Sequence, residues 1–271
     1  MSMKLVPVSS TQNDVFKALL KSSDGKGDFV LVHGLKLIDE VLRSKALAPK
    51  TIVARSGFSL EKSDLARDVF SRRFEQPVSR ILLDDALFDQ LDPVGVPDAL
   101  AAFERPMISK YDFKSPASGA SLMAATQNPA NLGALIRSAV AFGIKNVICL
   151  KEAAHPLHPK TVRGSMGHVL DLKLFQGPSI HDLGGFEAGS QPNGLFSRLV
   201  TLDLEGEPLQ NFKWPGDPIV LIGEEGRGVP KGFKGARLQI PHLKSVDSLN
   251  AGVSGGIALY DFYLKSQPQK S

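Results

Sequence analysis

Three stretches of the chain combine polar side chains with glycine at points where an apolar run has just ended. The first spans 128–133 with the sequence NPANLG, the second 222–230 with IGEEGRGVP, and the third 240–250 with IPHLKSVDSLN. Open α/β sheets bind their ligands at the carboxyl ends of their strands. Because all three stretches follow predicted strands, we expect them to meet in one site that offers a cation, carboxylates, amides and hydroxyls.

The first stretch runs into a helical pattern, so its backbone N–H groups would face an anion. We expect Asn131 to cap this helix and Gly133 to let a backbone or a ligand approach closely. Arg137 follows one to two turns later, and its planar guanidinium can reach back over the loop to a phosphate. A capped helix with a solvated arginine is the alternative interpretation of this stretch on its own.

The second stretch carries three glycines and the adjacent carboxylates Glu224 and Glu225, which could bind a hydroxyl or a cation. A surface turn with solvated charges is the alternative. The spacing is not GxGxxG, and the lysine of a P-loop is absent, which argues against a nucleoside triphosphate site. In the third stretch, Ser248 is the expected cap of the last helix, and Asn250 is expected to bond to nearby backbone.

The composition is that of an ordinary globular protein, with 42% hydrophobic and 22% charged residues among 271. This length predicts one large domain or two ordinary ones. The net charge of +4 favours polyanionic partners only weakly. No apolar run reaches transmembrane length, and the first residues lack the apolar core of a signal peptide, so we expect a cytoplasmic protein.

The single cysteine, Cys149, lies in the apolar run 146–150, which predicts a buried strand thiol rather than a nucleophile. One cysteine excludes an intrachain disulfide and an all-cysteine zinc site. His155 and His158 occur in the run HPLHPK, which has two prolines and no obvious third ligand. A loop is therefore favoured over a metal site, and we expect no metal.

The first part of the chain alternates helical and strand patterns and predicts a compact α/β domain over 1–105. A helix is expected after Asn13, whose side chain can cap it. The other expected elements of this domain are strands at 29–32, 51–55 and 81–83, a helix around 37–42 and a long helix over 60–74.

The segment 106–120 holds two prolines and many small residues with little periodicity, and it is expected to be a linker. A second α/β domain is expected over 121–271. Its last helix should start near Ser248. The expected strands lie at 122–125, 147–150, 199–202 and 219–222, with a helix at 131–142, and the last three of these strands are typical of a buried parallel sheet.

The second domain resembles the SpoU/TrmH family of RNA 2′-O-ribose methyltransferases, which belongs to the SPOUT class. Three family motifs occur in order, NPANLGALIRSA at 128–139, IVLIGEEGRGVP at 219–230 and IPHLKSVDSLNAGVSGGIALY at 240–260. The stretch 160–168, KTVRGSMGH, resembles a further shared segment. The stretch 29–44 is similar to the family's RNA-recognition domain, a ribosomal-protein-like α/β fold, although His33 replaces the usual acidic residue.

The resemblance implies a smaller N-terminal RNA-binding domain and a C-terminal SPOUT domain with a deep trefoil knot, a rare exception to the rule against threaded chains. It also implies a homodimer and S-adenosylmethionine as the methyl donor. The donor would be held largely through backbone groups of the second and third stretches. The implied cofactor-binding residues are Ile222, Gly223, Glu224, Gly228, Ile240 and Leu249.

By the same resemblance, Arg137 is the leading catalytic residue and acts in its own subunit or across the dimer. An arginine is effectively always protonated, so positioning a substrate phosphate that helps to activate the ribose hydroxyl is favoured over a role as base. Asn131 would hold Arg137 or the ribose, and Glu225, Ser248 and Asn250 would orient substrate and donor. Asn128 and Glu224 replace the usual aspartate and asparagine, and Ala251-Gly252 replaces the usual Val-Ser, but no residue assigned to catalysis is lost.

The N-terminal domain favours ribosomal RNA of the 23S type as substrate, because the family's tRNA enzymes often lack such a domain. A tRNA 2′-O-methyltransferase and a non-catalytic RNA-binding paralogue remain as alternatives. A dinucleotide-dependent dehydrogenase would need a glycine-rich turn after its first strand, which the sequence lacks. The residues that could contact RNA phosphates, or simply be solvated, are Arg43, Lys45, Arg55, Arg72 and Arg73.

Overall fold

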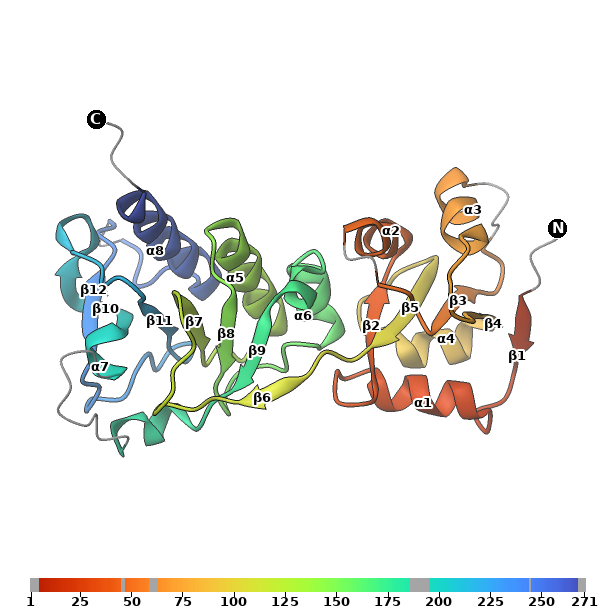
Figure 1. The fold of residues 1–271 in the computed structure, drawn as a ribbon, viewed down its shortest axis with the longest axis horizontal. Helices are drawn as coiled ribbons and strands as arrows, with labels where there is room; N and C mark the ends of the chain where they lie inside the picture. The colour runs from red at the N-terminus through yellow and green to blue at the C-terminus, as the bar shows by residue number, and fades with distance from the viewer. Residues whose placement is uncertain (1–4, 45–46, 59–62, 186–194, 244, 268–271) are drawn as a thin grey trace. The chain divides into compact units, whose positions relative to one another are not determined.

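The computed structural model describes residues 5–44, 47–58, 63–185, 195–243 and 245–267. The chain forms two compact units, one from Met1–Pro106 with His155–Leu170, the other from Met107–Ala154 with Asp171–Ser271. Each unit is a sheet covered by helices (Figure 1), so the α/β class expected from the sequence is confirmed. No helix of the described ranges is both long enough and apolar enough to span a bilayer.

The N-terminal unit is built on a five-stranded sheet with the order β1-β4-β3-β5-β2. Strands β1, β4 and β3 are parallel neighbours, whereas β5 runs antiparallel between β3 and β2. The elements are β1 (Val6–Val8), α1 (Asp14–Ser22), β2 (Phe29–His33), α2 (Leu35–Ser44), β3 (Thr51–Arg55), α3 (Asp64–Ser71), β4 (Ser79–Leu83), α4 (Asp85–Leu91) and β5 (Ala99–Glu104). Strands β1 and β5 and helix α4 are not among the elements predicted from the sequence.

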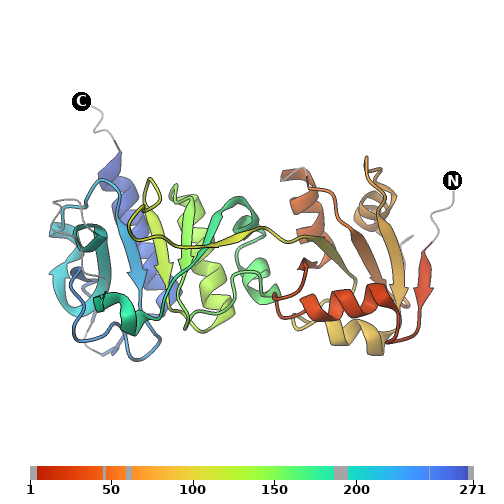
Figure 2. The ribbon, with the colours of Figure 1, turned by 60° about the horizontal axis from the view of Figure 1, so that its bottom comes forward.

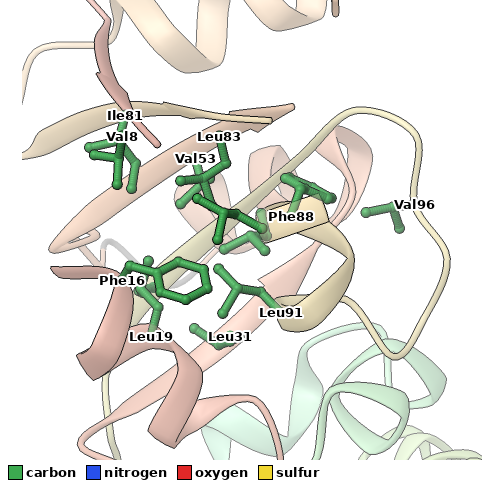
Figure 3. Packing of buried hydrophobic residues seen from close by; sticks show 13 residues of the cluster. Val8, Phe16, Leu19, Leu31, Val53, Ile81, Leu83, Phe88, Leu91 and Val96 are labelled. Atoms are coloured by element: carbon green, nitrogen blue, oxygen red, sulfur yellow. The ribbon is translucent and has the colours of Figure 1, made fainter. Parts of the chain in front are cut away.

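The N-terminal unit has an apolar core of its own. Figure 3 shows Phe16 and Leu19 of α1 packed with Leu31 of β2 and Leu91 of α4. As expected, α1 is capped by Asn13, whose side chain accepts from two N–H groups of the first turn. Burying a side chain of this size contributes about 1.5–3 kcal/mol, so the cluster can stabilise the unit substantially.

The segment His155–Leu170 folds with the N-terminal unit although it follows three strands of the other sheet, β6, β7 and β8, in sequence. Its helix α6 (Pro159–Gly164) packs against β2. Gly167 lies so close to α2 that an added Cβ would be 2.8 Å from Val41 Cγ2. The predicted domain limits assigned this segment to the second domain, because contacts between residues distant in sequence cannot be read from local patterns.

The C-terminal unit is a seven-stranded sheet with the order β12-β10-β11-β7-β8-β9-β6. All its neighbouring strands are parallel. The strands are β6 (Ile108–Lys110), β7 (Ser121–Ala124), β8 (Asn146–Cys149), β9 (Lys173–Gln176), β10 (Leu199–Pro208), β11 (Ile219–Ile222) and β12 (Ala236–Gln239). Every residue of β7, β8 and β11 is buried, as expected for parallel strands with both faces covered.

Two sequence expectations about this sheet need comment. Cys149 is a buried thiol of β8, as predicted, and burial raises its pKa to about 12. The predicted linker 106–120, in contrast, contributes β6, which pairs with β9 at the edge of the sheet. A three-residue strand is too short to leave a periodic pattern in the sequence.

Helices α5 (Pro129–Ala141) and α8 (Ala251–Ser266) pack side by side against the sheet (Figure 2). Gly255 of α8 makes the close approach to α5 feasible, because an added Cβ would collide with Leu135. The apolar face predicted for the helix at 131–142, now α5, is buried. It includes Leu132, Leu135, Ile136 and Ala139.

The predicted N-terminal caps, Asn131 for α5 and Ser248 for α8, are both wrong. The cap of α5 is Asn128, whose Oδ1 accepts from Ala130 N at 2.8 Å, because Pro129 is favoured in the first helical position. The cap of α8 is Asn250, whose Oδ1 accepts from Gly252 N at 2.8 Å, and Ser248 lies before the helix. Asn131 is therefore free to use its side chain elsewhere.

Candidate functional site

A cavity of about 770 Å³ opens at the carboxyl ends of the parallel strands in the C-terminal unit. Such a volume lies within the range of pockets for ligands of drug or cofactor size. All three polar stretches contribute to its wall. Ten of the residues singled out from the sequence line it, namely Asn131, Ile222, Gly223, Glu224, Glu225, Gly228, Ile240, Ser248, Leu249 and Asn250.

The loop after β11 forms one wall of the cavity and is held in a tight turn. Glu224 N donates to Gly228 O and Gly228 N donates to Glu224 O, both at 2.9 Å. A Cβ on Gly223 would collide with the backbone of Gly228. Only glycine allows this close approach, so backbone groups rather than side chains face the cavity at this position.

Asn131 joins all three stretches through its side-chain amide. Its Nδ2 donates to Glu225 Oε1 at 2.8 Å, and its Oδ1 accepts from Asn250 Nδ2 at 3.2 Å. The sequence predicts that Asn131 holds Arg137 or a ribose, and this stays a prediction. In the structure its amide belongs to a three-residue network that holds the Glu225 carboxylate at the cavity wall.

Glu224 occupies a more enclosed position than Glu225, with its side chain only 8% exposed. Its carboxylate lies 3.5 Å from His181 Nε2 and 3.5 Å from Gln127 Nε2. His181 belongs to a short 3₁₀ helix, Ile180–Gly185, and Gln127 follows β7. These contacts tie the loop after β11 to two neighbouring parts of the unit.

One wall of the cavity is not predicted from the sequence, and it is formed by Leu202, Asp203, Leu204 and Glu205. These residues lie in an irregularity of β10, where both Leu202 and Glu207 pair with Leu238 of β12. Arg237 forms an ion pair with Asp203 and anchors the bulge. The polar run DLEGE directly after an apolar strand is the pattern that could have identified this wall.

Arg137 is exposed on α5 and is not among the residues that line the cavity. The expectation that it reaches back over the first loop stays a prediction. Its neighbours Ile136 and Ala139 are buried, whereas Arg137 itself lies on the exposed side of α5.

Most of the basic residues considered for RNA contacts are already paired in the N-terminal unit. Arg55 pairs with Asp85 and Asp89, and Arg43 and Arg72 each pair with Asp39 and Asp68. Arg73 is exposed and forms no ion pair with a described residue. Lys45 lies outside the described residues.

The two histidines of HPLHPK have roles inside the N-terminal unit. Leu157 N donates to His155 Nδ1, the Arg105 guanidinium lies 3.2 Å from His155 Nε2, and His158 caps α6. Burial, together with the nearby Arg105, lowers the pKa of His155 to about 4. In the parts of the chain that the structure describes, no group of three or more His, Cys, Asp or Glu side chains could hold a metal.

The cavity as a whole combines apolar walls with carboxylates. Leu202, Ile222, Val229, Leu238 and Ile240 offer surfaces for an aromatic or aliphatic group. The carboxylates of Asp203, Glu205, Glu224 and Glu225 lie around them and favour a ligand with cationic groups. This arrangement suits a ligand with a flat apolar part and a positively charged part.

Comparison with known proteins gives a match of residues 122–260, more than half of the chain, to the model of the SpoU rRNA Methylase family. The ribosomal RNA small subunit methyltransferase G 2 of Syntrophobacter fumaroxidans is 38% identical over 176 residues, which cover 65% of this chain and 33% of that protein. The chain therefore spans about a third of the length of this relative.

A second relative matches over nearly its whole length. The 23S rRNA (guanosine(2553)-2′-O)-methyltransferase of Bacillus subtilis is 23% identical over 263 residues, with 95% of this chain and 98% of that protein covered. Among solved structures, a SpoU methyltransferase of Streptomyces viridochromogenes in complex with AdoMet has a TM-score of 0.72 at 23% identity, covering 94% of this chain and 98% of that one. At this level of identity the structural likeness establishes the fold.

Proposed function

The chain belongs to the SpoU rRNA methylase family, and on this premise we propose that it transfers a methyl group from S-adenosylmethionine to a ribose 2′-hydroxyl of ribosomal RNA. The observation that carries the proposal is the cavity in which all three family motifs meet around the network of Asn131, Glu225 and Asn250. The Bacillus subtilis relative, which is named for ribose methylation of 23S rRNA, supports 23S-type RNA as the substrate.

The residues of the cavity fit S-adenosylmethionine. Its volume and apolar walls suit an adenosine, and its carboxylates suit the ammonium and sulfonium cations. The residues that would hold the donor are Ile222, Gly223, Glu224, Gly228, Ile240 and Leu249. When bound, the donor supplies a methyl group that is already activated on a sulfonium centre.

The protein's own task is then to bind and orient the ribose and to assist loss of the hydroxyl proton. We assign the fixed carboxylate of Glu225 to orientation of the 2′-hydroxyl, since Asn131 holds it at the cavity wall. Ser248 and Asn250 line the same wall and would orient substrate and donor. Arg137 is assigned to a phosphate of the substrate, because a guanidinium binds phosphate well and is a poor base.

The position of Arg137 supports a homodimer in which it serves the cavity of the second copy. It lies on the exposed side of α5, outside its own cavity. The neighbouring helix α8 carries an exposed apolar stripe formed by Val253, Ile257, Tyr260 and Leu264. The spacing of these residues by three and four places them along one side of the helix, which suits a protein partner.

Two finer features of the fold form part of the proposal. The C-terminal segment is proposed to be threaded as a trefoil knot, since β12 pairs at the edge of the sheet and α8 then returns to pack on α5 and β11. The N-terminal unit, essentially 1–105, is proposed to be the ribosomal-protein-like RNA-binding domain. A cytoplasmic location accompanies a ribosomal RNA substrate.

The test is methyl transfer from radiolabelled S-adenosylmethionine to RNA from a strain that lacks this protein. We expect label at a ribose of ribosomal RNA, and a loss of about 100-fold or more in Arg137→Ala. Label in tRNA alone would reassign the substrate. No label in any RNA, together with no calorimetric binding of S-adenosylmethionine, would favour a non-catalytic RNA-binding protein.

A further inference from the structure

The cavity wall is strongly acidic, and this creates a difficulty for any RNA substrate. Asp203, Glu205, Glu224 and Glu225 all line it, and Arg227 is the single lysine or arginine among the described lining residues. Each ribose 2′-hydroxyl in RNA lies next to a phosphodiester. A phosphate that enters a site lined by carboxylates is repelled unless a cation faces it.

The backbone presents Arg227 at the tip of the turn after β11. It lies between Gly226 and Gly228, whose φ angles of 82° and 66° are in the left-handed region that favours glycine. The turn is closed by the two hydrogen bonds between Glu224 and Gly228. The turn therefore fixes where the backbone of Arg227 lies at the cavity.

The guanidinium of Arg227 is also available for a ligand. The residue is exposed, and no described carboxylate forms an ion pair with it. The adjacent Glu225 is engaged by Asn131, and Asp203 is paired with Arg237. The arginines of the N-terminal unit discussed above, in contrast, are mostly neutralised by aspartates.

From this geometry we propose that Arg227 binds a phosphate of the substrate RNA at the mouth of the cavity, and so positions the target ribose beside Asn131 and Glu225. The proposal rests on the proposed function and adds a positioning residue for RNA. A planar guanidinium offers two parallel donors to phosphate oxygens, which a lysine cannot reproduce.

The test compares Arg227→Ala and Arg227→Lys with the control Lys231→Ala, an exposed lysine of the same loop that does not line the cavity. Two quantities are measured, the affinity for a 23S rRNA transcript at several salt concentrations and the calorimetric affinity for S-adenosylmethionine. We expect Arg227→Ala to weaken RNA binding by about 10-fold and to reduce the salt slope by about 1.

Arg227→Lys should keep the salt slope and recover part of the affinity, and Lys231→Ala should behave as wild type. Donor affinity should be unchanged in all three variants. Unchanged RNA affinity in Arg227→Ala would overturn the proposal, as would a selective loss of donor affinity, which would assign Arg227 to the donor's carboxylate. If Arg227→Ala binds RNA more weakly than wild type but the wild-type protein transfers no methyl group, the role of Arg227 stands and the proposed function is contradicted.

Discussion

At the scale of single residues, the amide of Asn131 decides how the site is organised. One face of the amide donates to Glu225 and the other accepts from Asn250, so its orientation is fixed from both sides. The three residues come from three separate stretches of sequence. A change at this position should disturb the relative placement of all three loops while leaving the buried core intact.

We expect Asn131→Asp to lower kcat/KM by about 100-fold, because a carboxylate would replace the donor and repel Glu225. The free energy of unfolding should fall by only about 1 kcal/mol, since the network lies at the cavity wall and not in the buried core. Steady-state methyl transfer and thermal denaturation measure the two effects.

The double variant Asn131→Asp with Glu225→Gln provides a matched control for this pair. The new Gln amide can donate to the new carboxylate, which restores one hydrogen bond with its direction reversed. Partial recovery of kcat/KM would identify the hydrogen bond itself as the important feature. Wild-type kcat/KM in Asn131→Asp alone would show that the network is dispensable.

At the scale of elements, the contact between α5 and α8 sets the distance between the first and third stretches. Gly255 lies in this contact, where a Cβ would collide with Leu135 and lie 3.2 Å from Ile222 Cδ1. Gly256 is the next residue of the same helix, and its Cβ would meet only the side chain of Ser138, with Oγ at 3.3 Å.

Gly255→Ala should therefore lower the free energy of unfolding by about 1–3 kcal/mol, which is typical of overpacking a filled core. Gly256→Ala is the matched control and should be neutral or slightly stabilising, because alanine is the better helix former. Chemical denaturation of both variants measures the difference. Equal stability of the two variants would mean that α8 can shift on α5 without cost.

The same elements indicate what the sequence can predict. The apolar runs that became β7, β8, β10 and β11 are local patterns, and the polar stretches at the ends of β7, β11 and β12 contain the ten cavity residues. The bulge in β10 arises from pairing with β12, and the caps depend on a competition between Asn128 and Asn131. Such outcomes depend on distant partners or on small energy differences, so local patterns do not reveal them.

At the scale of the whole molecule, the exposed apolar stripe of α8 and the exposed Arg137 require a common explanation. Tyr260 is 50% exposed and Leu264 is 52% exposed, and Tyr260 also packs against Phe142 at the end of α5. A self-complementary contact between two copies would cover this stripe on both chains at once. The same contact could deliver Arg137 to the second cavity.

Complementation between two inactive variants tests whether Arg137 acts across the dimer. Arg137→Ala and Asn131→Asp are each expected to be inactive, so mixed dimers formed by refolding them together provide the assay. If Arg137 serves the partner's cavity, each mixed dimer contains one complete site, and an equal mixture should regain about a quarter of wild-type activity. If Arg137 serves its own cavity, each site in a mixed dimer carries one of the two defects and activity stays at background. Sedimentation velocity on the same samples supplies the control, because a monomer would contradict the shared site whatever the activity.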